Sequence, residues 1–469
     1  MPTNWNEVLS PEDIARIHAT SMRYLENVGV HIPSDDALAV FKVHGARTNG
    51  HIVFLEEQQV MDAIASVPAR FTIHARAPQK SVVVGGGELV FAPAYGAPFL
   101  VDYAAGKRAP TLQDYHNLAK LAHALPNQDM SGHLMVEPEG VSAAYLQMLY
   151  ANMVYSDKAF IGSAEGKKGA EHTLAMAGIL FGADFVAQNP VTISLINSLT
   201  PLGYSDEMLE ALLVFAHAGQ PVVVAALAMA GSTSPVTLAG TLALQNAELL
   251  AGVALTQWIN PGTPVVYGST STNIDMRTGA LAIGSPELSM MIAAHAQLAR
   301  HYGLPARSGG SLTDSSVPDA QAGFESMLGL VTTAASGVDF VLHAAGILSS
   351  YLAFSYEKFV MDDEMCGIVR RYRKGIEVTD ATLAYDIGAK VGPGGNFLME
   401  THTVKRCRTE FWSPDLVDRG GLEAWMSGGQ QTVLDRANRR WKKLLERYEQ
   451  PAMDESVAQQ LEAFVKARS

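Results

Sequence analysis

Short apolar runs alternate with longer stretches of helical period along most of the chain, and residues 231–271 contain one complete alternation. The hydroxyl residues 232–234 stand before Pro235 and predict a helix start near Ser234, because hydroxyl oxygens accept from free amides of the first turn. Leucine or valine at 238, 242, 249, 250 and 253 predicts one apolar helix face, which ends at Asn260-Pro261-Gly262. The apolar run 264–267 then predicts a parallel strand buried on both faces.

Eight such alternations can be counted. The predicted strands lie near residues 90–92, 132–136, 159–162, 192–196, 222–226, 265–267, 305–307 and 340–342. The predicted helices begin near Thr111, Val141, Lys167, Ser205, Pro235, Ser285, Asp319 and Ser355. Strands that alternate with helices indicate a parallel sheet, and eight units of about 35 residues fit closure into a TIM-type (α/β)8 barrel.

The segments before and after these units predict extensions of the barrel. Residues 1–87 are expected to form an N-terminal α/β extension, with a helix capped by Ser10 and a second helix near residues 33–36. The glycines at 85–87 precede a strand rather than a helix, which favours a tight hairpin turn over a nucleotide-binding loop. The barrel domain is expected to span 88–410. Residues 411–469 contain two amphipathic helical stretches, expected to pack on the barrel or on a neighbouring subunit.

The amino-acid composition limits which ligands the protein is expected to bind and where in the cell it is expected to be. The 469 residues are 48% hydrophobic and only 17% charged, with a formal net charge of −13 and no basic cluster, which argues against nucleic-acid binding. Cys366 and Cys407 are far apart and form no CxxC pattern. The N-terminus is polar and acidic, and polar residues, Gly or Pro interrupt the apolar runs. We expect a cytoplasmic protein without a membrane span.

Several blocks resemble the trimethylamine methyltransferase family: SPVTLAG at 234–240, QNAELLAG at 245–252, PGTPVVYG at 261–268, and the segments 313–325 and 357–364. The resemblance covers most of residues 10–410. Pyrrolysine is absent, so the resemblance is to the pyrrolysine-free branch, whose substrates are quaternary amines such as glycine betaine. It implies an (α/β)8 barrel that moves a methyl group from the amine to the Co(I) centre of a separate corrinoid protein.

Barrel enzymes have their active sites at the carboxyl ends of the strands, so the predicted register yields a list of candidate residues. In strand order these are Tyr95, His133, Glu137, Ser163, Glu165, Asn197, Met229, Ser269, Thr270, Arg307, Thr313, Asp314 and His343, followed by Tyr351, Phe354 and Tyr356. No lysine stands at a strand end, which disfavours a Schiff-base aldolase. The predicted substrate-binding set is Tyr95, His133, Glu165, Arg307, His343, Tyr351, Phe354 and Tyr356, with no catalytic acid, base or metal ligand assigned.

These residue types suit demethylation of a quaternary ammonium group, because the leaving group is a neutral tertiary amine that needs no proton. The positive charge disappears along the reaction, so aromatic faces stabilise the cation without the ground-state grip of a carboxylate. Phe354 and Tyr356 are therefore expected in an aromatic cage. Arg307 or His343 is expected to bind the substrate carboxylate.

Each candidate also has a structural alternative. Tyr95 could pack its loop, His343 could be a buried hydrogen-bonded residue, and Arg307 could pair with Glu165 or Glu137. Asp314 and Asp319 flank a helix start and are expected to be capping residues. Asp362, Asp363 and Glu364 are expected to form a solvated or barrel-facing charge run.

The function predicted from the resemblance is transfer of a methyl group from glycine betaine, leaving dimethylglycine. Other betaines, such as proline betaine or carnitine, are alternatives. Glycine-rich loops at 308–311 and 344–346 are also compatible with an alternative function, that of a barrel enzyme that binds a phosphate group. A non-catalytic betaine-binding subunit is a third alternative. No DxHxxG corrinoid-binding signature occurs. We therefore expect a corrinoid carried by a partner protein, no tightly bound cofactor, and a homo-oligomer.

Overall fold

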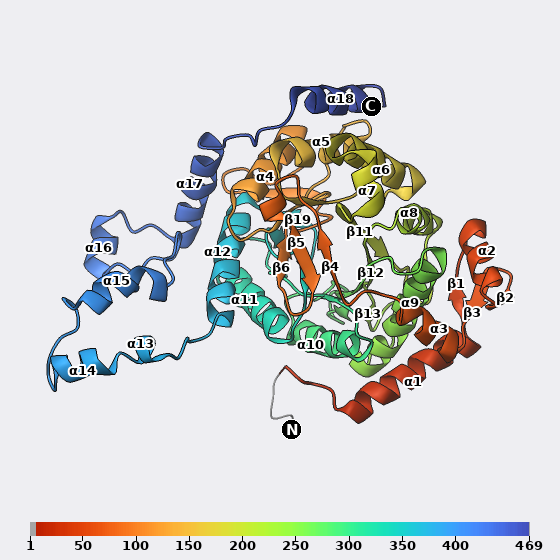
Figure 1. Cartoon of the computed structure of the whole chain (residues 1–469), viewed down its shortest axis with the longest axis horizontal. Helices are drawn as coiled ribbons and strands as arrows, with labels where there is room; N and C mark the ends of the chain where they lie inside the picture. The colour runs from red at the N-terminus through yellow and green to blue at the C-terminus, as the bar shows by residue number, and fades with distance from the viewer. Residues whose placement is uncertain (1–5, 469) are drawn as a thin grey trace.

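Eight parallel strands form the centre of the protein, whose computed structural model describes residues 6–468 (Figure 1). They are β6 (Val90–Ala92), β9 (Met130–Ser131), β10 (Ala159–Ile161), β11 (Thr192–Asn197), β12 (Val222–Ala226), β14 (Val265–Ser269), β16 (Ala306–Arg307) and β17 (Phe340–Leu342). The sheet order is β6-β17-β16-β14-β12-β11-β10-β9. The amide of Asp129 donates to the carbonyl of Phe91 at 2.8 Å and closes the ring between β9 and β6. The predicted TIM-type barrel is confirmed.

Helices surround the barrel. The helices are α4 (Leu112–Ala124), α5 (Ala144–Tyr155), α6 (Gly166–Phe181), α7 (Ala183–Gln188), α8 (Asp206–His217), α9 (Leu238–Ile259), α10 (Pro286–His301), α11 (Ala320–Ala335) and α12 (Tyr356–Arg373). Five of the predicted start residues are the observed N-caps. Side chains of Thr111, Ser205, Ser285, Asp319 and Ser355 accept amide hydrogen bonds at these starts.

Two predicted boundaries are wrong. Helix α9 has Thr237 as its N-cap instead of Ser234, because the amides of 232–234 bond to the carbonyl of Met229 in a turn. The second strand lies at Met130–Ser131 instead of 132–136, because its partners on β10 are Ala159 and Phe160. His133 therefore lies beyond the strand end and not within the strand.

An antiparallel hairpin, β4 (Arg70–Ile73) and β5 (Val82–Gly85), closes the amino-terminal end of the barrel. Phe71, Ile73 and Val84 share one apolar cluster with inward-facing barrel residues such as Val223. Gly85 has a φ of +90°, and a side chain there would collide with the carbonyl of Ala69. The glycines at 85–87 connect β5 to β6, which do not pair, so they form a connecting turn and not the predicted hairpin turn.

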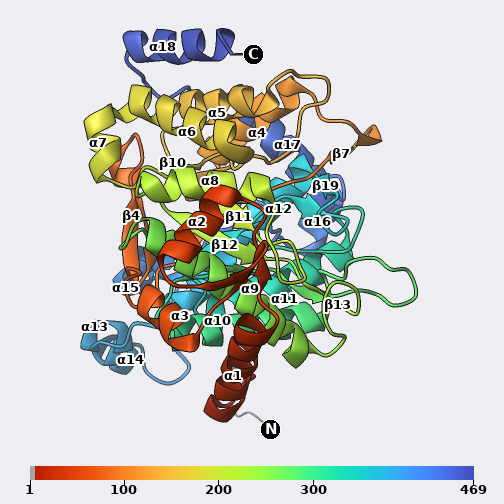
Figure 2. The same ribbon diagram turned by 90° about the vertical axis from the view of Figure 1, so that its right-hand side faces the viewer.

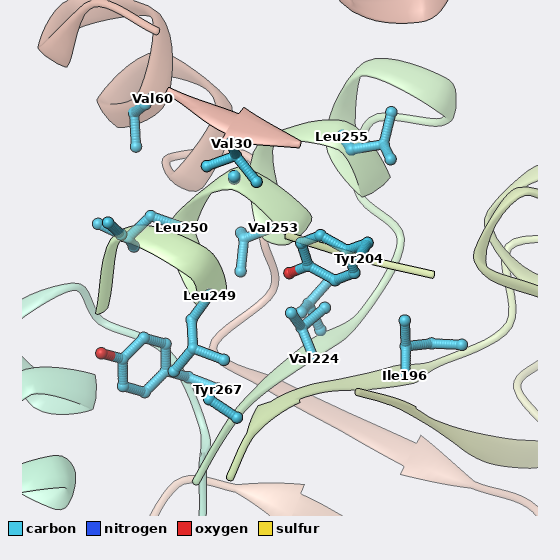
Figure 3. Close-up of a cluster of buried hydrophobic side chains, with 14 of the residues drawn as sticks. Val30, Val60, Ile196, Tyr204, Val224, Leu249, Leu250, Val253, Leu255 and Tyr267 are labelled. Carbon is cyan, nitrogen blue, oxygen red and sulfur yellow. The ribbon is translucent and has the colours of Figure 1, made fainter. Parts of the chain in front are cut away.

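The N-terminal extension covers α9. It contains α1 (Pro11–Asn27), β1 (Val30–His31), α2 (Asp35–Val43), β2 (Arg47–Asn49), β3 (Ile52–Phe54) and α3 (Glu57–Ile64). Figure 3 shows Val30 and Val60 on one side of α9 and the barrel residues Ile196 and Val224 on the other. The residues of α9 from Thr241 to Gln257 are consequently all buried, and the predicted single apolar face is wrong.

Helix α9 is also the one described helix that is long and apolar enough to cross a membrane. Its most apolar window has a mean hydropathy of 1.3, but 83% of that window is buried inside the protein. The N-terminal extension on one side and the barrel on the other account for this apolar composition, so α9 is a core helix.

Short strands flank the open end of the barrel, and helices complete the chain. The strands are β7 (Phe99–Asp102), β8 (Gly106–Arg108), β18 (Ile347–Leu348) and β19 (Ala353–Phe354) in one sheet, and β13 (Met229–Ala230) with β15 (Thr272–Asn273) in another. Helix α17 (Val433–Glu446) packs on α12 and α4, and α18 (Glu455–Lys466) packs on α5 and α6. Both C-terminal helices thus lie on the barrel.

Residues 374–430, here called the arm, project from the side of the barrel (Figures 1 and 2). The arm contains α13 (Asp380–Leu383), α14 (Tyr385–Val391), α15 (Thr401–Glu410) and α16 (Leu422–Ser427). It follows α12, which ends at Arg373. The domain boundaries at residues 87 and 410 stay a prediction.

Candidate active site

Arg307 stands in the barrel interior, in a layer of small side chains. Strand pairing aligns Arg307 with Gly268, Gly268 with Ala225, and Ala225 with Asn197. Because paired residues of neighbouring strands face the same side, all four point inward, as Val223 and Val266 do two residues earlier. Glycine and alanine beside Arg307 leave room for its guanidinium group across the barrel.

Arg307 is a buried cation, only 2% exposed, without a carboxylate partner. Among the described residues no carboxylate lies within ion-pair distance of it, and its Nε atom has no hydrogen-bond partner. The predicted alternative, a pair with Glu165 or Glu137, is not formed. Burial lowers the pKa of Arg307 to about 10. A buried positive charge without a partner is costly, so the site is prepared for an anionic group.

His343 follows β17 and connects the Arg307 side of the barrel to Tyr95. Its backbone has a φ of +75°, and its Nδ1 accepts from the amide of Tyr95 at 3.1 Å. Burial, helped by the nearby charge of Arg307, holds the pKa of His343 well below its usual value. The imidazole is therefore neutral with its proton on Nε2, which is a hydrogen-bond donor.

Tyr351 lies against His343, with ring centroids 4.8 Å apart and planes inclined by 52°. Burial raises the pKa of its hydroxyl, and Thr270 and the charge of Arg307 oppose this rise. Three consecutive residues, Ser349, Ser350 and Tyr351, have left-handed backbone conformations with φ of 50°, 52° and 75°. Non-glycine residues adopt this conformation at a cost, and such strain is concentrated at functional sites.

Asp314 holds this left-handed turn in place. Its carboxylate accepts from the amides of Ile283 and Gly284 at 2.8 and 2.9 Å and from the hydroxyl of Ser350 at 2.7 Å. One side chain therefore joins the loops that follow β15, β16 and β17. The capping role predicted for Asp319 is observed, whereas Asp314 caps no helix.

Buried charged side chains on α12 hold the loops that follow β16 and β17 from the outer side of the barrel. Lys358 and Asp362 on α12 form an ion pair with both side chains fully buried. The Lys358 ammonium donates to the carbonyl of Ser311 at 3.2 Å, and Asp362 accepts from the amide of Gly346 at 2.8 Å. Asp362 and Asp363 thus face the barrel, one of the two predicted arrangements, whereas Glu364 fits neither because it accepts from the amides of residues 415–417. The sequence analysis assigned no role to Lys358. The signal that could have identified it is the spacing of Lys358 and Asp362, which lie four residues apart on α12 and therefore on the same face of the helix.

His133 and Glu165 lie on the other side of the mouth. His133 is 1% exposed, and neither ring nitrogen has a hydrogen-bond partner in the described part of the chain. Its Nε2 is 3.9 Å from Oε1 of Glu165, whose side chain is 45% exposed. Tyr95 is half-buried, and burial followed by the charge of Glu165 raises its pKa. The structure thus gathers six predicted residues: Tyr95, His133, Glu165, Arg307, His343 and Tyr351.

Phe354 and Tyr356 lie elsewhere. Phe354 is fully buried, packs on Gly346, and has its ring 5.2 Å from that of Phe359. The Tyr356 hydroxyl donates to Asp114 at 2.9 Å and its ring stacks on Trp441 at 4.5 Å, between α4 and α17. These contacts give no support to the predicted cage role.

The glycines after β16 have a packing role. A side chain at Gly309 would collide with Thr333, and one at Gly310 with the carbonyl of His343. Both positions are filled by close contacts with α11 and the His343 backbone, so no open phosphate cradle exists at these two glycines. Within residues 6–468 no group of three His, Cys, Asp or Glu side chains could hold a metal ion.

A closed parallel barrel with polar groups at the carboxyl ends of its strands defines a TIM-barrel enzyme. The solved structure of the monomethylamine methyltransferase from Methanosarcina barkeri has the same fold, with a TM-score of 0.51 over 94% of both chains at 15% identity.

The family model for trimethylamine methyltransferase (MTTB) matches residues 2–469, and this chain belongs to that family. It is 49% identical to a glycine betaine methyltransferase of Desulfitobacterium hafniense (strain Y51) over 464 residues, 98% of this chain and 97% of that one. It is 34% identical to a proline betaine:corrinoid methyltransferase of Eubacterium limosum over 92% of this chain and 90% of that one.

Proposed function

We propose that this protein transfers a methyl group from glycine betaine to the Co(I) centre of a corrinoid carried by a separate protein, leaving dimethylglycine. The observation that carries the proposal is Arg307, a buried cation in a layer of small residues, which has no carboxylate partner among residues 6–468. A substrate carboxylate is the group that such a site lacks. The bidentate geometry of a guanidinium group suits it.

The remaining residues suit the other end of a betaine. With its carboxylate on Arg307 and the Nε2–H of His343, beside Tyr351, the trimethylammonium group would lie toward the ring of Tyr95. Aromatic faces attract a cation by about 0.5–2 kcal/mol each and exclude water. The reaction removes the positive charge, so contacts that align the methyl group accelerate it more than a carboxylate that holds the cation.

The corrinoid supplies the metal nucleophile, and this chain binds, orients and dehydrates the amine. No general acid is needed, because the leaving group is a neutral tertiary amine. Leu199, Leu227 and Leu352, in the loops after β11, β12 and β17, are 62%, 38% and 57% exposed around the mouth. An apolar rim of this kind suits the docking of a protein partner over the barrel.

Glycine betaine is the proposed substrate because the relative at 49% identity is named for it. Relatives named for proline betaine and L-carnitine are 34% and 31% identical, so these amines are the alternatives. The proposal includes a cytoplasmic location, a homo-oligomer and no cofactor bound tightly to this chain.

The test mixes the purified protein with a reduced corrinoid protein and separate samples of glycine betaine, proline betaine, carnitine, choline and trimethylamine. Loss of the Co(I) absorbance with glycine betaine, and dimethylglycine in equal amount, is expected. Demethylation of another betaine in its place would support that alternative. Calorimetric binding of betaine without methyl transfer would identify a non-catalytic subunit, and neither binding nor transfer would refute the proposal.

A further inference from the structure

The arm, residues 374–430, has an apolar surface that the protein itself does not cover. Of the 29 large apolar side chains exposed among the described residues, 13 belong to the arm, although it contains about an eighth of those residues. The 13 are Ile376, Val378, Leu383, Tyr385, Phe397, Leu398, Met399, Val404, Phe411, Val417, Leu422, Trp425 and Met426. Apolar residues concentrated in this way mark an interaction surface.

The arm helices are too short to be stable alone. They contain 4, 7, 10 and 6 residues, and none has a buried side chain. Isolated helices shorter than about 12–15 residues are marginal in water, and most helical stability in proteins comes from packing of an apolar face. Residues 415–417 are held on α12 by Glu364, whereas α13 and α14 extend away from the barrel (Figure 1). The apolar side chains of these helices have no surface of the described chain to pack on.

Two short stretches of the arm each carry charges of one sign, although Lys390 on α14 and Glu410 on α15 have the opposite sign. Residues 377–386, which include α13 and the start of α14, have the carboxylates Glu377, Asp380 and Asp386. Helix α15 has Lys405, Arg406 and Arg408. No ion pair involves any of these six side chains in the described structure. The arm's own ion pair, Lys390 with Glu400 at 2.9 Å, lies between the two groups along the chain.

We infer that the arms of two copies of this chain pair with each other. In a two-fold interface residue i of one copy meets residue j of the other and the reverse. An antiparallel arrangement places the acidic residues 377–386 of each copy against the basic residues 405–408 of the other, with Leu383, Tyr385, Leu398, Met399 and Val404 between them. The same chain thus supplies both the apolar surface and its complementary charges.

The size of the surface agrees with a second copy as the occupant. Thirteen large side chains that are mostly half-exposed or more offer on the order of 1,000 Å² of apolar area, and a standard interface buries about 800 Å² per partner. This inference does not depend on the proposed reaction.

Analytical ultracentrifugation of the full-length protein tests the pairing. Leu398→Lys with Met399→Lys is expected to halve the parental mass. Val43→Lys is the matched control, because Val43 is an 81% exposed apolar residue at the end of α2, remote from the arm, and it should leave the mass unchanged. Circular dichroism and betaine demethylation confirm that each variant is folded.

Charge reversal adds an independent measurement. Asp380→Lys with Asp386→Lys, or Lys405→Glu with Arg408→Glu, is expected to weaken association at least tenfold. All four changes in one chain should restore it. Arg439→Glu with Lys443→Glu on α17 is the matched control. A native mass of 50.2 kDa, or arm variants that keep the parental mass, would overturn the inference. Arm variants of parental mass that no longer transfer methyl groups to the corrinoid protein would assign the arm to that partner instead.

Discussion

The two sides of the barrel mouth differ in burial, charge and backbone strain. On the side of β16 and β17, Arg307 and His343 are buried, Tyr351 lies in a left-handed turn, and Asp314 and Lys358 tie the loops together. On the side of β9 and β10, the His133 side chain has no hydrogen-bond partner in the described chain and the nearby Glu165 side chain is 45% exposed. One side is rigid and positive, whereas the other is open and acidic.

We propose that this difference orients the two ends of a zwitterionic substrate. A carboxylate is held best where the cation is dry and the loops cannot move, because charge-assisted hydrogen bonds are stronger away from water. The trimethylammonium group needs access to a second protein, which only the open side allows. If this interpretation is right, changes on the rigid side should act on substrate affinity and stability together, whereas changes on the open side should be small.

The largest effect is expected for Arg307→Met. Loss of a charge-assisted contact should raise the half-saturating betaine concentration about ten- to a hundredfold. The same change removes a buried unpaired charge, so the free energy of unfolding of the ligand-free protein should rise by about 1–3 kcal/mol. Initial rates and urea unfolding measure the two quantities.

Betaine itself provides a further control for Arg307. It should raise the thermal midpoint of the parent protein and not that of Arg307→Met. Arg277→Met is the matched variant, since Arg277 is 89% exposed near the mouth and should change neither quantity. A parental betaine affinity in Arg307→Met would show that the carboxylate binds elsewhere.

The next largest effect is expected for Asp314→Asn. The amide group can keep the bonds from Ile283 and Ser350, but it faces the amide of Gly284 with a second donor. We expect a loss of about 1–3 kcal/mol in stability and a roughly tenfold rise in half-saturating betaine, because the turn that holds Tyr351 is released. Asp319→Asn changes the cap of α11 and the hydrogen bond from the Ser315 hydroxyl, but none of the bonds to residues 283, 284 and 350, and should leave betaine affinity unchanged. Equal affinity changes in both variants would mean that general destabilisation, and not positioning, is measured.

The fold could be predicted from the sequence because its signals are local. Most barrel strands are short apolar runs, with β9 (Met130–Ser131) and β16 (Ala306–Arg307) as exceptions, and hydroxyl or aspartate caps such as Ser205 and Asp319 mark helix starts directly. The wrong predictions concern features that depend on contacts between segments far apart in the sequence. The amphipathic pattern of α9 could not reveal that residues 11–64 cover its outer face, and the turn on Met229 delayed its start.

The sequence could predict where the site lies, but not the hydrogen bonds that join its residues to distant segments. Strand ends identify Arg307 and His343, because the barrel brings such ends together. Phe354 also follows a strand, but a second small sheet turns its ring into the core. Asp314 has a helix start five residues later and was read as a cap. Its hydrogen bonds to residues 31 and 36 positions away are invisible in a local pattern.

A smaller effect is expected from the pH dependence of His343. The pKa of His343 in the folded protein lies below its value of about 6.5 in the unfolded chain. Below about pH 6.5 the unfolded chain therefore binds more protons at this residue than the folded protein does. Its contribution to stability is complete above about pH 6.5 and is lost below it, by up to about 1.4 kcal/mol per pH unit. His343→Asn accepts from the Tyr95 amide without titrating, and asparagine tolerates a positive φ. The parent should lose more stability than this variant between pH 6.5 and 5 in urea unfolding, and parallel curves would show that His343 is protonated freely in the folded protein.

The smallest effect is expected on the open side, for Glu165→Gln. The Glu165 side chain is 45% exposed and its carboxylate is 3.9 Å from His133, beyond hydrogen-bond distance, so water screens its charge and little binding energy should depend on it. The half-saturating betaine concentration should change less than about threefold, and the rate at saturation should stay near the parental value. Glu171→Gln, on the outer surface of α6, is the matched control with a similarly exposed carboxylate. A tenfold or larger loss of rate in Glu165→Gln alone would mean that a carboxylate does hold the ammonium group, and the division of the mouth into a carboxylate side and a solvent-facing methyl side would have to be reversed.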